Sequence, residues 1–124
     1  MLAAGLVVGL GTDGPSSNNV QDMFQEMKAA ALLAKVSTMD PTALNARQVV
    51  RMATINGAIA LGMEKEIGSL EIGKKADIIT VSLSKPHLQP IHDPYSHLVY
   101  VVNGSDVSNV IVNSQVLLRN YQRV

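Results

Sequence analysis

Cysteine and tryptophan are absent from the 124-residue sequence, and its aromatic residues are limited to three tyrosines and one phenylalanine. The lack of cysteine excludes disulfide bonds and thiolate metal sites, and it is compatible with a reducing compartment. Because 47% of the residues are hydrophobic while so few are aromatic, the core is expected to be aliphatic. A chain of this length suffices for one domain with a modest core.

Neither sign of charge dominates the sequence. Ten basic and ten acidic residues give a formal net charge of zero. Because like charges form no block, neither nucleic acid nor an acidic surface is expected as a partner. The apolar N-terminal run ends at Gly11 and has no basic residue before it, so it is shorter than the roughly 20 residues of a membrane span. We therefore expect no membrane partner and a cytoplasmic location.

The N-terminal half predicts a strand and then a helix. Residues 6–12 are apolar on both faces, which is typical of a strand buried in a parallel sheet. Asn18 or Asn19 would cap the helix that follows, with Asp22 in its first turn and an end near residues 36–37. The apolar stripe of this helix, at helical spacing, consists of Phe24, Met27, Ala31 and Ala34.

A second helix is predicted to begin after Asn45, its N-cap, and to stop at Gly62. A glycine inside a helix costs about 1 kcal/mol relative to alanine, so Gly57 indicates close packing against a neighbouring element. The composition changes near residues 63–68, where a helical half gives way to a β-rich half. Neither half looks complete, because the predicted strands are too few to close a sheet and would leave unpaired edges.

The C-terminal half predicts a strand at residues 77–82 and a short helix at about 94–102. Asp93 would cap this helix, and Gly104 lies just past its end. A β-hairpin is expected around residues 113–114, where an Asn-Ser pair separates two apolar runs.

Three glycines near the N-terminus, Gly9, Gly11 and Gly14, have the spacing of a dinucleotide-binding loop. A dinucleotide fold would continue through a helix into a second strand that ends in an acidic residue, whereas here another helix follows. Asp13 would also place its charge where a pyrophosphate should bind. Two interpretations of Asp13 remain: a catalytic or metal-binding carboxylate at the end of a barrel strand, or an Asx-type turn before a helix.

The other polar clusters carry less chemical information. His87, His92 and His97 are five residues apart, which matches neither the helical nor the strand spacing of metal ligands, so loop packing or solvent exposure is expected. Arg47 and Arg51 share one helix face and could bind an anion. A solvated or salt-bridged face is the alternative for these two arginines.

Three long stretches of the sequence resemble the amidohydrolase superfamily. They are "GLGTDGPSSNNVQDMFQEMKAAALLAK", "NARQVVRMATINGAIALGMEKEIGSLEIGKKADIITVSL" and "PHLQPIHDPYSHLVYVVNGSDVSNVIV". Within the superfamily they are most similar to the branch of methylthioadenosine/S-adenosylhomocysteine deaminases, guanine deaminase-like enzymes and triazine hydrolases. The resemblance covers essentially all 124 residues.

The resemblance implies an α/β fragment of a metal-dependent hydrolase with a (β/α)₈ barrel. Residues 1–66 would be the end of the barrel, namely its last strand and helix with a following helix. Residues 67–124 would be part of a small β-sandwich, with Asp77 in a structural turn. By resemblance, Asp13 is a ligand of one divalent metal, usually zinc. It is also the base that takes a proton from the metal-bound water as hydroxide attacks an electron-poor ring carbon.

The family's other metal ligands have no counterpart here. The sequence has no HxH pair, and its histidines do not match the ligand positions of the family. The resemblance therefore implies the C-terminal portion of a parent enzyme that acts on C–N or C–Cl bonds of a small heterocycle, such as a purine, pterin or triazine. We expect the metal site to be unoccupied in the isolated chain, and the chain to be inactive.

An association role is the alternative to a catalytic one. The chain would then be a non-catalytic module, or one half of a split enzyme. In either case a second copy or a complementing chain is expected to cover its exposed strand edges.

Overall fold

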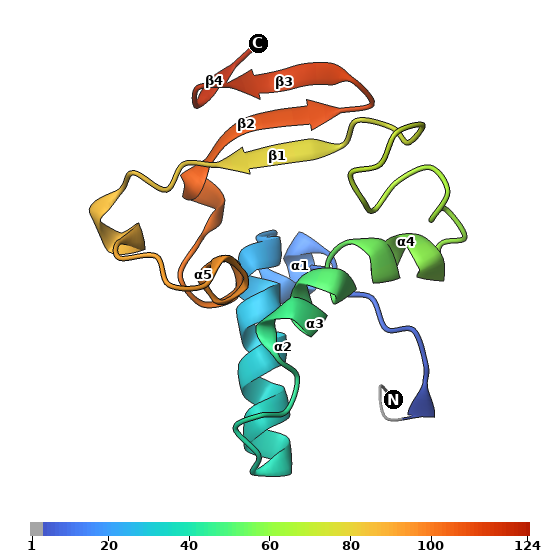
Figure 1. Cartoon of the computed structure of the whole chain (residues 1–124), viewed down its shortest axis with the longest axis vertical. Helices are drawn as coiled ribbons and strands as arrows, with labels where there is room; N and C mark the ends of the chain where they lie inside the picture. The colour runs from blue at the N-terminus through green and yellow to red at the C-terminus, as the bar shows by residue number, and fades with distance from the viewer. Residues whose placement is uncertain (1–3) are drawn as a thin grey trace.

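The computed structural model describes residues 4–124, and the first three residues of the apolar N-terminal run lie outside it. Figure 1 shows a sheet layer above a layer of helices. In chain order the elements are α1 (Pro15–Asn18), α2 (Met23–Thr38), α3 (Ala46–Met52), α4 (Ile55–Ala60), β1 (Ile78–Val81), a 3-10 turn (Pro86–Leu88), α5 (Pro94–Tyr100), a second 3-10 turn (Gly104–Asp106), β2 (Val107–Val112), β3 (Gln115–Arg119) and β4 (Gln122–Arg123). Within residues 4–124, no helix has the length and apolar character that crossing a membrane requires.

The expected strand at residues 6–12 is not formed. This segment runs without regular secondary structure beside α3 and α4, on the side away from the sheet (Figure 1). It is held by the amide of Leu10, which donates to the Met52 carbonyl at 3.0 Å, and by Asn56 Nδ2, which donates to the Val8 carbonyl at 3.3 Å. A strand needs a neighbouring strand to pair with, and no other segment among residues 4–124 lies beside it as one.

The start of the first long helix also differs from the prediction. Asp22 is the N-cap of α2, and its Oδ1 accepts a hydrogen bond from the Phe24 amide at 2.9 Å. Asn18 and Asn19 instead end a separate helix, the short α1. The reason is that Asn19 takes a non-helical backbone (φ 64°, ψ −31°), which ends α1 before a new helix begins.

The second predicted helix is broken in two. Asn45 caps α3 in a reciprocal capping box with Gln48, as expected for an N-cap. The helix then stops at Met52, because the Met52 carbonyl accepts from the Leu10 amide and Thr54 takes a non-helical backbone (φ −130°, ψ −102°). The predicted stop at Gly62 is confirmed, since Gly62 adopts φ 69° just after α4.

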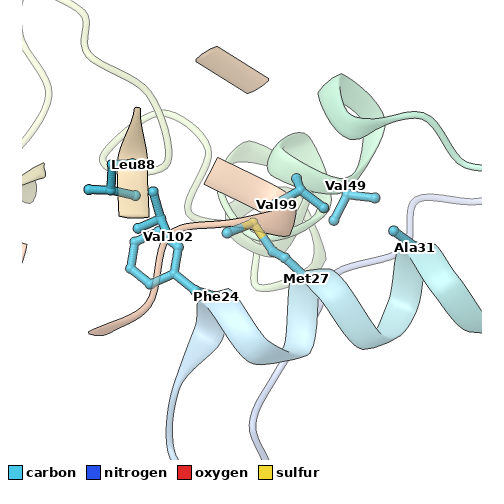
Figure 2. Close-up of a cluster of buried hydrophobic side chains, with 7 residues drawn as sticks. All are labelled: Phe24, Met27, Ala31, Val49, Leu88, Val99 and Val102. Carbon is cyan, nitrogen blue, oxygen red and sulfur yellow. The ribbon is translucent and has the colours of Figure 1, made fainter. Parts of the chain in front are cut away.

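The core lies between α2, α3 and α5. α5 packs against both α2 and α3. Figure 2 shows how side chains from these helices meet residues of the loop before α5 and of the segment after it. The buried cluster consists of Phe24, Met27, Ala31, Val49, Leu88, Val99 and Val102. The predicted stripe of α2 is thus confirmed at three of its four positions, while Ala34 is only half-buried.

The sheet is antiparallel throughout, in the order β1-β2-β3-β4. The hairpin between β2 and β3 turns at Asn113 (φ 48°) and Ser114 (φ 66°), and positive φ at both positions is the signature of a tight two-residue turn. Asp77 supports this turn, because its Oδ1 accepts from the Asn113 amide at 2.6 Å. The structural role expected for Asp77 is therefore confirmed.

The short helix of the C-terminal half begins where its capping residue and proline predict. Asp93 Oδ2 accepts from the Ser96 amide at 2.7 Å, and Pro94 occupies the first turn of α5. The helix ends at Tyr100, and Gly104 begins the second 3-10 turn instead of directly terminating α5.

Candidate active-site loop at Asp13

Asp13 lies in an exposed loop between the N-terminal segment and α1. Its backbone is left-handed (φ 57°), a conformation that aspartate tolerates better than most residues with a Cβ. Both carboxylate oxygens have a donor: Oδ1 accepts from the Gly14 amide at 2.7 Å, and Oδ2 accepts from the Ser17 hydroxyl at 2.8 Å. The carboxylate is therefore held by its own loop and presented to solvent.

These two donors also favour the ionised form of the Asp13 carboxyl. The Ser17 hydroxyl, and secondly the Gly14 amide, lower the pKa of the Asp13 carboxyl below its ordinary value, because both stabilise the ionised form. Asp13 is thus an anion at neutral pH. An ionised carboxylate is the form that binds a divalent metal or accepts a proton.

Asn18, at the end of α1, connects the end of the loop to its beginning. Asn18 Nδ2 donates to the Thr12 carbonyl at 2.7 Å and to Glu26 Oε1 at 2.6 Å. Because Glu26 belongs to the first turn of α2, these bonds connect the backbone next to Asp13 to a helix that reaches the core. The sequence indicated a turn here, but it did not indicate this contact.

The glycine spacing of this region has a packing explanation. A Cβ built on Gly9 would lie 3.1 Å from the Gly57 Cα atom, so the two backbones are in direct contact. Gly14 is the N-cap position of α1, which has only four residues. In a dinucleotide fold the glycine loop opens a longer helix whose N-terminus faces the pyrophosphate, whereas here Gly9 packs against Gly57 of α4 and the loop leads into the four-residue α1.

The histidines are not brought to Asp13. His97 Nε2 lies 2.7 Å from the Leu88 carbonyl oxygen, and His87 Nε2 lies 3.1 Å from Asp106 Oδ2. His92 is exposed. Residues 4–124 contain no cluster of three or more His, Cys, Asp or Glu side chains that could hold a metal. The residues present therefore do not make a complete metal site, and Asp13 supplies one ligand at most.

The sequence reasoning missed a buried acidic side chain, Asp106. Its carboxylate has no exposed surface and lies 2.9 Å from Lys85 Nζ and 3.1 Å from His87 Nε2. Burial alone raises the pKa of Asp106, but hydrogen bonds from Lys85, the Asn103 amide and His87 outweigh burial and lower the pKa to about 2. A capping-box pattern, Asn103 followed three residues later by Asp106, was the available signal.

Arg47 and Arg51 line an open cavity of about 320 Å³ between α3, α5 and the loop after α4. The Arg47 guanidinium lies 4.5 Å from the centroid of the Tyr95 ring, a cation–π geometry. Among the described residues neither arginine forms an ion pair. The facing wall carries Glu71, which pairs with Lys74 at 3.2 Å. Both arginines are exposed, so they lie on a solvated helix face that is not salt-bridged within residues 4–124, and anion binding by this face stays a prediction.

Comparison with known proteins shows a matching family model and a similar curated relative. A model of the amidohydrolase family matches residues 1–117. The chain is 54% identical over 122 residues to a 5-methylthioadenosine/S-adenosylhomocysteine deaminase 1 from Syntrophus aciditrophicus (strain SB), and this match covers 98% of the chain but only 28% of the relative. The chain thus spans little more than a quarter of that protein's length.

Two solved structures have the same arrangement. An adenosine deaminase from Xanthomonas campestris with bound zinc matches with a TM-score of 0.96 and 41% identity, over 99% of this chain and 28% of that one. The zinc complex of an atrazine chlorohydrolase from Arthrobacter aurescens TC1 matches with a TM-score of 0.83 and 35% identity, over 99% of this chain and 27% of that one. The resemblance predicted from the sequence is confirmed.

Proposed function

This chain belongs to the amidohydrolase family, and we propose on that premise that it is the C-terminal portion of a metal-dependent hydrolase. The proposed parent removes the exocyclic amino group of an adenosine-type nucleoside by cleaving a C–N bond with water. The observation that carries this proposal is the 54% identity to a 5-methylthioadenosine/S-adenosylhomocysteine deaminase across 98% of the chain. Cleavage of a C–Cl bond on a triazine is the weaker candidate, since identity to the atrazine chlorohydrolase is only 35%.

The proposed position of the chain within the parent is based on the strand edges that the chain leaves unpaired. Residues 1–66 would complete a (β/α)₈ barrel, in which the segment at residues 6–12 becomes the last strand once neighbouring strands are supplied. Residues 67–124 would form part of a small β-sandwich. The TM-score of 0.96 to one section of the Xanthomonas campestris deaminase supports this assignment, because that section belongs to a longer chain.

In the proposed parent, Asp13 is a metal ligand and a catalytic base. Zinc in the Xanthomonas campestris and Arthrobacter aurescens structures supports a divalent metal. The remaining ligands would come from outside these 124 residues, since residues 4–124 hold no group of three or more His, Cys, Asp or Glu side chains that could bind a metal. What this chain itself contributes is an ionised, solvent-facing carboxylate held by Gly14 and Ser17.

A chimeric enzyme tests the proposal. The section of the Syntrophus aciditrophicus relative that matches this chain is replaced by residues 1–124, and deamination of 5-methylthioadenosine is measured with zinc present. We expect activity in the chimera and its loss, by at least about 100-fold, in Asp13→Asn, because the amide is neutral and a poor proton acceptor. Asp40→Asn is the matched control, since Asp40 is also exposed and also accepts hydrogen bonds within its own turn. An active Asp13→Asn chimera would refute the role of Asp13.

An association role is a second candidate, favoured by exposed apolar side chains on α2 and directly after it. Leu33 is 66% exposed, Val36 is 70% exposed and Met39 is 87% exposed. An exposed apolar surface of this kind is typical of a site that contacts another protein chain. We propose that a second copy, or a chain that supplies the rest of the barrel, provides it. Size-exclusion chromatography with light scattering tests this point, and a well-behaved monomer at high concentration would contradict it.

A further inference from the structure

We propose that Asn18, held by Glu26, is a positioning residue that fixes the backbone at Thr12 and Asp13 and so places the Asp13 carboxylate. The inference rests on the proposed role of Asp13, which it deepens by naming the side chains that hold its loop. Neither Asn18 nor Glu26 belongs to the proposed chemistry. Their role follows from how the loop is attached to the rest of the fold.

One side-chain amide makes both connections. Asn18 Nδ2 donates to the Thr12 carbonyl, six residues earlier, at 2.7 Å, and to Glu26 Oε1, eight residues later, at 2.6 Å. Both Asn18 and Glu26 are half-buried. The two N–H groups of a single amide thus link the peptide bond before Asp13 to the first turn of α2.

The Leu10 amide, which donates to the Met52 carbonyl, attaches the chain before the loop to α3, but the hydrogen bonds of the Asp13 carboxylate itself are internal to the loop. Gly14 and Ser17, which hold the Asp13 carboxylate, belong to the same exposed loop and α1. These bonds orient the carboxylate relative to the loop but do not fix the loop relative to the core. Glu26 does so, because α2 places Phe24 and Met27 in the buried cluster. A left-handed residue such as Asp13 (φ 57°) also needs its surroundings to hold it in place.

The chemistry of the two acceptors selects an amide at position 18. A carbonyl oxygen and a carboxylate oxygen must each accept a hydrogen bond, so the side chain between them must offer two N–H or O–H donors. Asparagine offers two, whereas serine and threonine offer one and ionised aspartate offers none. Glutamate and glutamine are both able to accept at position 26, through a carboxylate or an amide oxygen.

The test uses the 124-residue chain and nuclear magnetic resonance relaxation of its backbone. In the unchanged chain we expect the order parameters of Thr12 and Asp13 to be about 0.85, as for rigid backbone, and in Asn18→Asp we expect them to fall below about 0.6. The melting temperature of Asn18→Asp should also fall, by about 5 °C, because both hydrogen bonds are lost. Glu26→Gln alone should leave both measurements unchanged.

The double variant Asn18→Asp/Glu26→Gln separates positioning from simple stabilisation. The glutamine amide is able to donate to the new carboxylate, so the link between α1 and α2 returns and the melting temperature should recover in part, because one of the two hydrogen bonds is restored. The Thr12 carbonyl still faces an acceptor, so Thr12 and Asp13 should stay mobile. Recovery of rigidity together with stability would overturn the proposal, and so would an Asn18→Asp chain with a rigid loop.

A failure of this proposal is distinguishable from a failure of the proposed function. Loop order is measured without metal or substrate, whereas the role of Asp13 is measured by deamination in the chimera. In the chimera, Asn18→Asp/Glu26→Gln should deaminate the substrate more slowly than the unsubstituted chimera. Glu26→Gln alone should leave the deamination rate unchanged. An active Asp13→Asn chimera beside an ordered, Asn18-dependent loop would refute the proposed catalytic role of Asp13 and leave the positioning role of Asn18 intact.

Discussion

Gly9 and Gly57 touch through their backbones although 47 residues separate them in the chain. A Cβ on Gly9 would lie 3.1 Å from the Gly57 Cα, whereas a Cβ on Gly57 would meet only the Met52 carbonyl oxygen, at 3.9 Å. The contact is therefore asymmetric. A side chain at Gly9 would meet backbone at a tight distance, whereas Gly57 has room for one.

This asymmetry predicts opposite effects for two alanine substitutions. Gly9→Ala should destabilise the chain by about 1–3 kcal/mol, because backbone atoms must move apart. Gly57→Ala should be neutral or stabilise it by up to about 1 kcal/mol, because alanine is a better helix former. Urea unfolding of both variants measures the difference. A larger loss in Gly57→Ala than in Gly9→Ala would contradict the packing described here.

The Ser17 hydroxyl is the main cause of the lowered pKa of Asp13. Ser17→Ala should therefore raise that pKa toward the ordinary value. A smaller fraction of Asp13 would then be ionised near pH 3 to 4, while ionisation at neutral pH would be unchanged. Carbon-13 spectra of the carboxyl group during a pH titration measure the shift. The neighbouring Ser16→Ala is the control, and an equal shift there would exclude a specific role for Ser17.

Asp106 should make stability depend on acid pH. Its pKa in the folded chain is lowered to about 2 from an ordinary 3.8, so its contribution is complete above about pH 4 and is lost as pH falls through 2. This contribution is on the order of 2 kcal/mol. Urea unfolding between pH 2 and pH 7 should show the loss in the unchanged chain. The pH dependence should be weaker in Asp106→Asn, and a slope equal to that of the unchanged chain would contradict the assignment.

The isolated chain should not catalyse deamination. Asp13 alone cannot hold a metal, because a catalytic zinc usually has three or more protein ligands and residues 4–124 offer no cluster of that kind. Calorimetric titration with zinc should show no site at Asp13, and an ammonia-release assay with adenosine-type nucleosides should give no signal above buffer. Zinc-dependent release of ammonia that Asp13→Asn abolishes would refute this prediction.

Local features of the fold were predictable from the sequence. The caps at Asn45 and Asp93 and the turn at residues 113–114 form where their residue types place them. The reason is that a cap or a tight turn is decided by a few neighbouring residues and their own hydrogen bonds. The resemblance of whole motifs to the amidohydrolases rested on the same kind of information, the order of residues along the chain. The division at residue 66 stays a prediction.

Contacts between distant segments were decided only by the tertiary structure. Residues 6–12 have the composition of a strand but do not become one, because pairing depends on a neighbouring strand and not on the segment itself. The second helix breaks after Met52, where Thr54 takes a non-helical backbone and the Met52 carbonyl accepts from the Leu10 amide, 42 residues earlier. Asp106 has a lowered pKa because the fold carries Lys85 and His87 to it. The sequence by itself determined the caps, the turns and the family resemblance, and the tertiary structure decided which of its polar groups meet.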